Sequence, residues 1–167
     1  MIGVLQQIKT HAKDFPGAYS AVGDFYLRMG NNDDAIREYR DGIAKDPNKK
    51  ATYQKRIIEA LMRQGKREEA AEVNEEILKA DPADNDAHGL AATLLLDKGD
   101  INRALTELQA VVARAPNNAV AHYQLGRAHE ARGESEQARQ EYQKAVDIRP
   151  DYLLARLAVA QLQLRKR

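Results

Sequence analysis

The sequence predicts an all-α fold, a right-handed α-solenoid of helix-turn-helix repeats, and two periodic sets of helix breakers support this prediction. Four prolines are 35, 34 and 34 residues apart, and four glycines show the same spacings. Proline cannot continue a helix and glycine commonly ends one. Two interleaved sets of breakers at one period divide the chain into equivalent pairs of short helices, which is typical of a solenoid. The breakers are Pro47, Pro82, Pro116 and Pro150, with Gly30, Gly65, Gly99 and Gly133.

The breakers also set the phase of the array. With each proline as the thirty-second residue of its unit, every unit holds two helices of about 12–14 residues, a usual length in globular proteins. The predicted segments are an N-terminal helix (1–15), four repeats (16–50, 51–84, 85–118 and 119–152) and a C-terminal helix (153–167) with the pattern of a truncated fifth repeat.

Small and apolar residues recur at helical spacing in every predicted second helix. The stripe follows an i, i+4, i+7 pattern, which places its members on one helical face. Each stripe begins with alanine, because a larger side chain would hold neighbouring helices apart. Just before these helices we expect Asn32, Asp33, Asp100 and Ser135 to cap free N–H groups. The stripes are Ala35, Tyr39 and Gly42; Ala70, Asn74 and Ile77; Ala104, Leu108 and Val111; and Ala138, Tyr142 and Ala145.

The last predicted helix is more apolar than the end of an array requires. A terminal helix normally presents a polar outer face, so we expect the chain to be a fragment of a longer array. A complete small protein whose last helix folds back is the alternative. An exposed apolar end also predicts self-association. The apolar residues are Leu153, Leu154, Leu157, Val159, Leu162 and Leu164.

Composition excludes several classes of protein. Lys and Arg total 26 against 25 Asp and Glu, and a net charge of +1 gives no long-range field for nucleic acid or anionic lipid. The absence of cysteine excludes disulfides, a thiol nucleophile and thiolate metal ligands. No apolar run approaches the ~20 residues of a membrane-spanning helix. The N-terminus has no basic region typical of a signal peptide, which slightly favours the cytoplasm.

The pattern resembles the tetratricopeptide repeat family. The resemblance spans residues 16–152, but the family's first aromatic position holds Tyr19, Gln54, His88 and His122, and Asn74 replaces a bulky apolar residue. The resemblance implies a groove lined by the first helices. The best-matching unit carries Leu125, Gly126, His129, Gly133, Ala138, Tyr142, Ala145 and Pro150.

The groove positions of the family identify candidate partner-binding residues in this chain. Cationic side chains there would pair with an acidic group of a peptide, and tyrosine and arginine are favoured at interface hot spots. The alternative is that these charges satisfy one another along the helix, as Glu59 and Arg63 would. The candidates are Lys55, Glu59, Arg63, Thr93, Tyr123 and Arg127.

The resulting hypothesis is a non-catalytic module that binds a protein, peptide or partner helix in its concave groove, without a cofactor. The chain lacks a placed nucleophile and base and a phosphate-binding glycine loop. His122 and His129 share a helix face, but further converging ligands for a metal are not evident. The chaperone-tail clamp known in one subfamily is not expected, because only Lys55 fits it. Alternatives are self-assembly through the terminal helices and a regulatory array within a larger enzyme.

Overall fold

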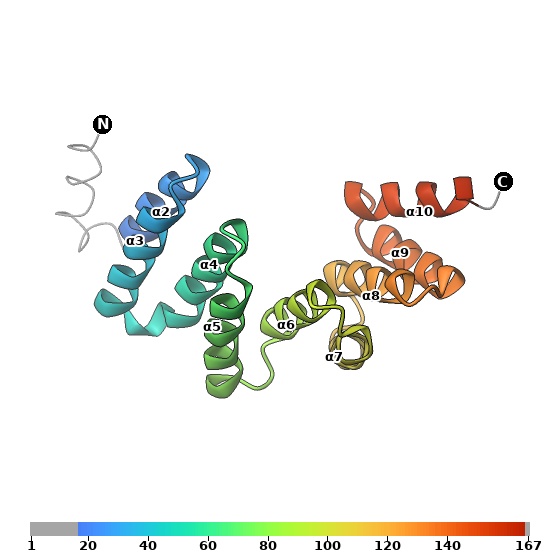
Figure 1. Ribbon diagram of the computed structural model, residues 1–167, viewed down its shortest axis with the longest axis horizontal. Coiled ribbons are helices and arrows are strands. Elements are labelled where there is room, and N and C mark those ends of the chain that lie inside the picture. Colours follow the sequence, from blue (N-terminus) through green and yellow to red (C-terminus); the bar gives the residue numbers. More distant parts are fainter. Residues whose placement is uncertain (1–16, 166–167) are drawn as a thin grey trace. The chain divides into compact units, whose positions relative to one another are not determined.

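The computed structural model describes residues 17–165, which form helices joined by short turns (Figure 1). The chain divides into two compact units, unit 1 (Met1–Pro82) and unit 2 (Ala83–Arg167). The predicted all-α fold of paired helices is therefore confirmed. The predicted N-terminal helix, 1–15, lies outside the described residues.

Unit 1 is built from two helix pairs connected by a short 3-10 turn. Each helix packs against the next one in the chain, so α3 lies between α2 and α4. The 3-10 turn η1 begins at Pro47 and lies where the sequence has one additional residue. The elements are α2 (Ala18–Arg28), α3 (Asn32–Lys45), η1 (Pro47–Lys49), α4 (Lys50–Arg63) and α5 (Arg67–Ala80).

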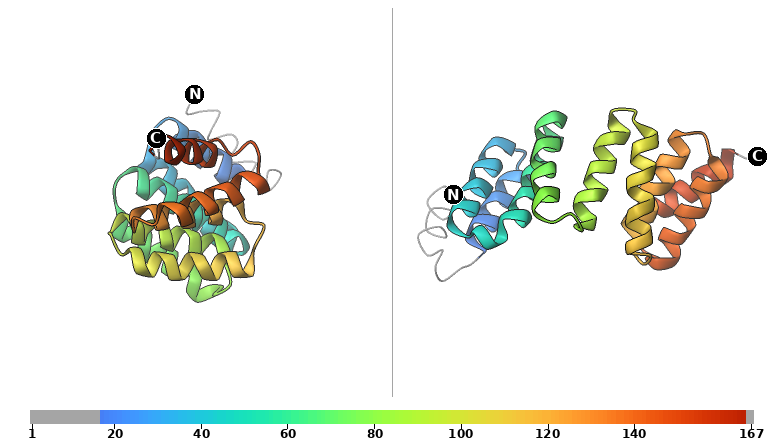
Figure 2. Two further views of the ribbon diagram at one scale, coloured as in Figure 1. Left: turned by 90° about the vertical axis from the view of Figure 1, so that its right-hand side faces the viewer. Right: turned by 90° about the horizontal axis from the view of Figure 1, so that it is seen from below.

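Unit 2 repeats this arrangement and adds one helix at its end. Helix α8 packs against α6, α7 and α9, and α10 packs against α9 (Figure 2). The elements are α6 (Asn85–Asp97), α7 (Ile101–Arg114), α8 (Ala119–Ala131), α9 (Ser135–Ile148) and α10 (Leu153–Arg165). None of the described helices is long and apolar enough to cross a membrane.

The four periodic glycines make the tight turns within the pairs. Their φ angles lie between 75° and 84°, a left-handed conformation that costs glycine little because it has no Cβ. After each glycine, the next backbone N–H bonds back into the finished helix, as from Asn31 to the carbonyl of Tyr26 at 2.9 Å. The following helix then begins at once.

This turn geometry explains why most predicted caps are wrong. Asn32 and Ser135 are already the first residues of α3 and α9, and Asp33 lies in the first turn of α3. Asp100 alone is confirmed, with its carboxylate accepting from the N–H of Arg103 at 3.4 Å. The cap position directly follows the glycine. Two caps that were not expected, Asp84 and Asn118, accept from Ala87 and Ala121 at the starts of α6 and α8.

The predicted second-helix stripes form the packed seams. The alanines at their heads are all 0% exposed, and the other stripe residues are also buried. Small and large residues complement one another across these seams. A Cβ placed on Gly23 would lie 2.3 Å from the ring of Tyr39, and one on Gly42 would lie 2.6 Å from the ring of Tyr53. Interiors packed at this density hold the helix pairs in one arrangement.

Candidate protein-interaction surface

The six predicted partner-binding residues lie on first helices, but they belong to both units. Lys55, Glu59 and Arg63 are on α4 of unit 1. Thr93 is on α6 of unit 2, and Tyr123 and Arg127 are on α8. Each unit is therefore considered by itself.

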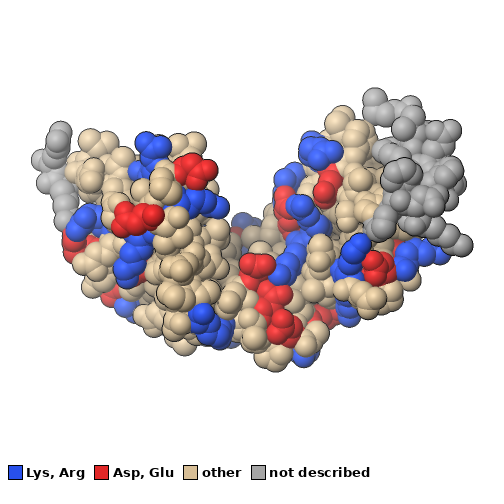
Figure 3. Space-filling view, turned by 180° about the vertical axis from the view of Figure 1, so that it is seen from behind, with Lys and Arg blue, Asp and Glu red and all other residues tan. Residues whose placement is uncertain are grey.

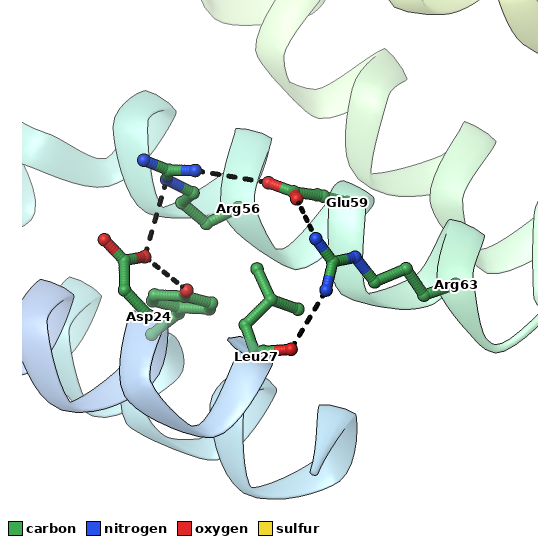
Figure 4. A network of polar contacts seen from close by, with 6 residues as sticks. Asp24, Leu27, Arg56, Glu59 and Arg63 are labelled. Atoms are coloured by element: carbon green, nitrogen blue, oxygen red, sulfur yellow. Dashed lines mark hydrogen bonds and ion pairs between the residues drawn. The ribbon is translucent and has the colours of Figure 1, made fainter. Parts of the chain in front are cut away.

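In unit 1, Glu59 and Arg63 are engaged with neighbouring groups (Figure 4). Glu59 accepts from Arg63 at 2.8 Å through one carboxylate oxygen and from Arg56 at 3.2 Å through the other. Arg63 also donates to the backbone carbonyl of Leu27 at 2.9 Å, close to the end of α2. That carbonyl is among the last four of its helix, which have no partner within the helix. The expected Glu59–Arg63 pair is confirmed.

Arg56 extends this network to α2 and α3, and it was not among the predicted residues. Its Nε lies 3.6 Å from the carboxylate of Asp24, which in turn accepts from the hydroxyl of Tyr39 at 2.7 Å. Burial, together with the hydrogen bond to Asp24, raises the pKa of Tyr39, so the phenol remains a donor. A signal was present in the sequence, because Arg56 precedes Glu59 by three residues and shares its helix face.

The network leaves unit 1 with a polar surface whose charges largely satisfy one another. Arg56, Glu59 and Arg63 have side chains that are 48%, 39% and 49% exposed. Exposed ion pairs of this kind contribute about 0–1 kcal/mol each, so their main effect is to fix the orientation of the side chains.

Tyr123 lies in a cluster of aromatic rings in unit 2. Its ring centroid is 5.5 Å from that of Tyr142 and 5.2 Å from that of Tyr152. The guanidinium of Arg149 lies 3.8 Å from the centroid of Tyr152, a cation–π distance. Tyr123 also packs against the apolar cluster that includes Val159. The residue predicted as a flat anchor is thus half-buried and contributes to packing.

The other two candidates of unit 2 make only short-range polar contacts. Arg127 donates to the side-chain oxygen of Gln124 at 2.9 Å, and within residues 17–165 no carboxylate is in ion-pair distance of it. The hydroxyl of Thr93 donates to the carbonyl of Gly89 at 3.0 Å, one turn earlier in α6. Arg127 therefore retains guanidinium donors for an acidic group.

Glu130 connects α8 to α9 and α10, and sequence reasoning missed this role. It accepts from the hydroxyl of Tyr142 at 2.9 Å and from Arg165 at 2.7 Å. Burial and the hydrogen bond to Glu130 raise the pKa of Tyr142. Because Arg165 follows Glu130 by 35 residues, only the repeat phase places the two side by side.

Several large apolar side chains on α8 and α10 are exposed. Val120 on α8 is 46% exposed, and Leu154 and Leu157 on α10 are 53% and 49% exposed. Leu153 and Leu164, also on α10, are 63% and 68% exposed. The last helix, predicted from the sequence to be apolar, therefore exposes several of its apolar side chains to solvent.

The three histidines within residues 17–165 each pair with a different carboxylate. His88 contacts Glu107 at 2.7 Å, and His129 contacts Glu134 at 2.6 Å. His122 contacts Glu141 at 2.6 Å through Nδ1, while Nε2 donates to the backbone carbonyl of Pro116 at 2.9 Å. In the part of the chain that the structure describes, no group of three or more potential ligands could hold a metal ion. The histidines act as links between helices.

Charges of both signs are mixed on the face of the molecule that Figure 3 shows. There, lysine and arginine side chains lie among aspartate and glutamate side chains. This mixture agrees with the net charge of +1.

Two family models described as tetratricopeptide repeat match the sequence, one over residues 26–94 and one over residues 90–152. The chain belongs to the tetratricopeptide repeat (TPR) family. Together the matches extend from the last turn of α2 to the end of α9, and they leave out most of α2 and all of α10. No curated protein sequence matches the chain.

Solved structures of TPR proteins share this fold. MamA (residues 41 to the end) from Desulfovibrio magneticus is 28% identical, with a TM-score of 0.68 over 89% of this chain and 83% of that one. A thermophilic TPR protein of Thermus thermophilus has a TM-score of 0.78 at 18% identity, covering 96% of this chain and 89% of its own. YrrB, described as a TPR protein with an unusual peptide-binding site, has a TM-score of 0.67 at 20% identity, covering 94% and 84%. At these identities the last two show the fold alone.

Proposed function

We propose that the chain is a non-catalytic protein-interaction module that binds a peptide or a partner helix along its first helices. The contact residues within repeats 16–50, 51–84, 85–118 and 119–152 would include Lys55, Glu59, Arg63, Thr93, Tyr123 and Arg127. The observation that carries the proposal is the membership of the TPR family over residues 26–152. YrrB, which shares the fold, is described as having a peptide-binding site.

The packing of the helix pairs supports a binding role in physical terms. Buried alanines such as Ala70 and Ala104 hold the second helices close, so the first-helix side chains stand on a rigid support. A preformed surface lowers the ordering cost of association. Thr93, Tyr123 and Arg127 offer a hydroxyl, an aromatic edge and a guanidinium to a ligand.

Site-specific photo-crosslinking in the source cells tests this proposal. A photoreactive amino acid would replace Arg63, Thr93 or Arg127 on the first helices, and Glu75 or Arg103 on the second helices as controls. Glu75 and Arg103 are 70% and 75% exposed, so they are at least as accessible as the first-helix positions. The proposal predicts a discrete crosslinked protein from first-helix positions alone. Crosslinks that are equal at both sets of positions would contradict it.

A second candidate function is self-association, and the exposed leucines of α10 favour it. Leu153, Leu157 and Leu164 follow one another along α10, opposite the buried Ala155 and Leu162. Pairing of this stripe with a second copy would remove apolar surface from water. Sedimentation equilibrium of the wild type and of a Leu153→Glu/Leu164→Glu variant tests it. A wild type that stays monomeric at the highest soluble concentration excludes this function.

A further inference from the structure

Exposed apolar side chains occupy equivalent positions on α8 and α10, beside the half-buried ring of Tyr123. We define the α8–α10 face as Val120, Tyr123, Leu154 and Leu157. Val120 and Leu154 are 34 residues apart, as are Tyr123 and Leu157, so each pair occupies the same position in successive repeats. The four residues thus project from equivalent turns of two neighbouring first helices.

Two direct contacts hold α8 and α10 in this arrangement. Near the start of the helices, the rings of Tyr123 and Tyr152 lie 5.2 Å apart. Near their ends, Arg165 donates to Glu130 at 2.7 Å. The opposite side of α10 is buried by α9, so the α8–α10 face cannot turn inward to cover its leucines.

On α8 and α10 themselves, arginines outnumber acidic residues. Helix α8 contains one acidic residue, Glu130, and α10 contains none. Both carboxylate oxygens of Glu130 already accept hydrogen bonds, from Tyr142 and from Arg165. Arg127 and Arg149 lie close enough to Tyr152 for their charges to act on its phenol. An incoming carboxylate would meet arginines and no unengaged acid on these two helices.

Unit 1 does not offer a comparable surface. Its first helices carry the network of Asp24, Arg56, Glu59 and Arg63, in which opposite charges are matched. Among the described residues of unit 1, Met29 is the one large apolar side chain that is more than half exposed, and it lies at the end of α2. Apolar contact combined with unmatched positive charge is a property of unit 2.

We propose that the α8–α10 face binds an acidic segment of a partner protein that places apolar side chains, such as leucine, against Val120, Leu154 and Leu157. The acidic groups of the segment pair with Arg127 and its neighbouring arginines. This inference rests on the proposed function and names the chemistry of its partner. Apolar burial supplies most of the affinity, and charge complementarity supplies orientation and selectivity.

The observations favour a protein segment over an anionic membrane. Membrane-surface helices carry many lysines and arginines beside a deep apolar face, whereas this face is bordered by few cations and includes a tyrosine packed between two rings. A second copy of the chain is less suited, because the face offers no unengaged acidic group on α8 or α10 to pair with its own arginines.

Fluorescence polarisation with two synthetic peptides tests the proposal on the full chain. Both peptides, of about 16 residues, carry leucine at every third or fourth position to form an amphipathic helix. One has glutamate at the remaining positions and the other has lysine. We expect the glutamate peptide to bind at least about 10-fold more tightly, with an affinity that falls as ionic strength rises.

Three variants separate this face from the rest of the molecule. Leu154→Glu/Leu157→Glu should weaken binding of the glutamate peptide about 10-fold or more, because it removes apolar contact and adds like charge. Arg127→Glu should shift the preference towards the lysine peptide. Met29→Glu, the matched control on unit 1, should leave both affinities unchanged. All four positions are on the surface, and circular dichroism verifies that each variant keeps its helix content.

Several results would overturn the inference. Equal affinity for the two peptides would mean that charge does not select the partner. If Met29→Glu weakens peptide binding as much as Leu154→Glu/Leu157→Glu does, the binding surface is not the α8–α10 face of unit 2. Binding of phosphatidylserine vesicles in place of either peptide would identify a membrane surface, and leucine-dependent self-association would identify a second copy. If photo-crosslinking captures a partner from Arg63 but not from Arg127, the proposed function stands and the inference on this face fails.

Discussion

The ring of Tyr142 on α9 fills the space that a side chain on Gly126 of α8 would occupy. A Cβ on Gly126 would lie 2.5 Å from Cδ1 of that ring and 3.1 Å from the backbone oxygen of Ala138. Tyr142 is 1% exposed, and its hydroxyl is held by Glu130, so the ring has little freedom to move away. The absence of a side chain at Gly126 is therefore part of how α8 and α9 pack.

Gly126→Ala should destabilise the protein by about 1–2 kcal/mol, because overpacking of a seam outweighs the better helix propensity of alanine. Gly89→Ala is the matched control in a first helix of the same unit, where a Cβ meets nothing within 4 Å. This control should be neutral or stabilising by up to about 1 kcal/mol. Urea unfolding followed by circular dichroism measures both. A loss of stability in Gly126→Ala with no loss in Gly89→Ala supports the packing described. Equal changes in stability in the two variants would refute it.

The spacing of breakers and apolar residues was sufficient to predict the helices and their seams. Glycine and proline act on the backbone locally, so Gly30 and Pro47 mark helix ends without knowledge of the fold. Alanines such as Ala35 could be placed in the seam because helical periodicity determines the buried face. These features depend on neighbours within a few residues in the sequence.

Contacts between helices could not be predicted in the same way. The donation from Arg63 to the carbonyl of Leu27 joins residues 36 positions apart and uses a backbone atom, which leaves no trace in residue type. Pairing of His88 with Glu107 and of His122 with Glu141 joins residues 19 positions apart in two repeats. That repeated separation was visible in the sequence, but its meaning depends on how the two helices of a pair face each other.

Ala104→Asp should destabilise the protein by roughly 2–4 kcal/mol, since Ala104 is 0% exposed among Leu105, Leu108 and Leu125 and the seam cannot solvate a carboxylate. Ala110→Asp, on the exposed side of the same helix, is the control and should change stability by less than about 0.5 kcal/mol. Thermal or urea unfolding of the three proteins gives the comparison. A loss below about 1 kcal/mol for Ala104→Asp would mean that the seam is not tightly packed.

Tyr123→Ala should lower stability by about 2 kcal/mol, whereas Arg127→Ala should change it by less than about 0.5 kcal/mol. The ring of Tyr123 contacts Tyr142 and Tyr152, and each aromatic pair adds to the apolar area that is lost. Arg127 contacts only Gln124 among the described polar groups. Chemical unfolding of each single variant measures the difference. If the two variants prove equally stable, Tyr123 is a surface residue and not part of the ring cluster.

Stability should depend on the ionisation of Glu141 at acid pH. Burial acts to raise the pKa of this carboxyl, but hydrogen bonds from Lys144 and His122 outweigh it and hold the pKa below its ordinary value of 4.5. A group whose folded-state pKa is lowered contributes stability above its unfolded pKa, and the contribution is lost as the pH falls through the folded pKa. The loss therefore begins near pH 4.5 and continues below it.

At about pH 6, the Glu141→Gln variant should have a lower free energy of unfolding than the wild type. This difference should shrink as the pH falls well below 4.5. His122→Gln tests whether the same pair is responsible, because Glu141 contacts Nδ1 of His122 at 2.6 Å. In a double-mutant cycle the two substitutions should be non-additive at about pH 6, and their coupling energy should fall as the pH drops below 4.5. Urea unfolding over this range measures the coupling. A coupling energy that stays constant across the range would show that ionised Glu141 is not what joins α9 to α8 at this position.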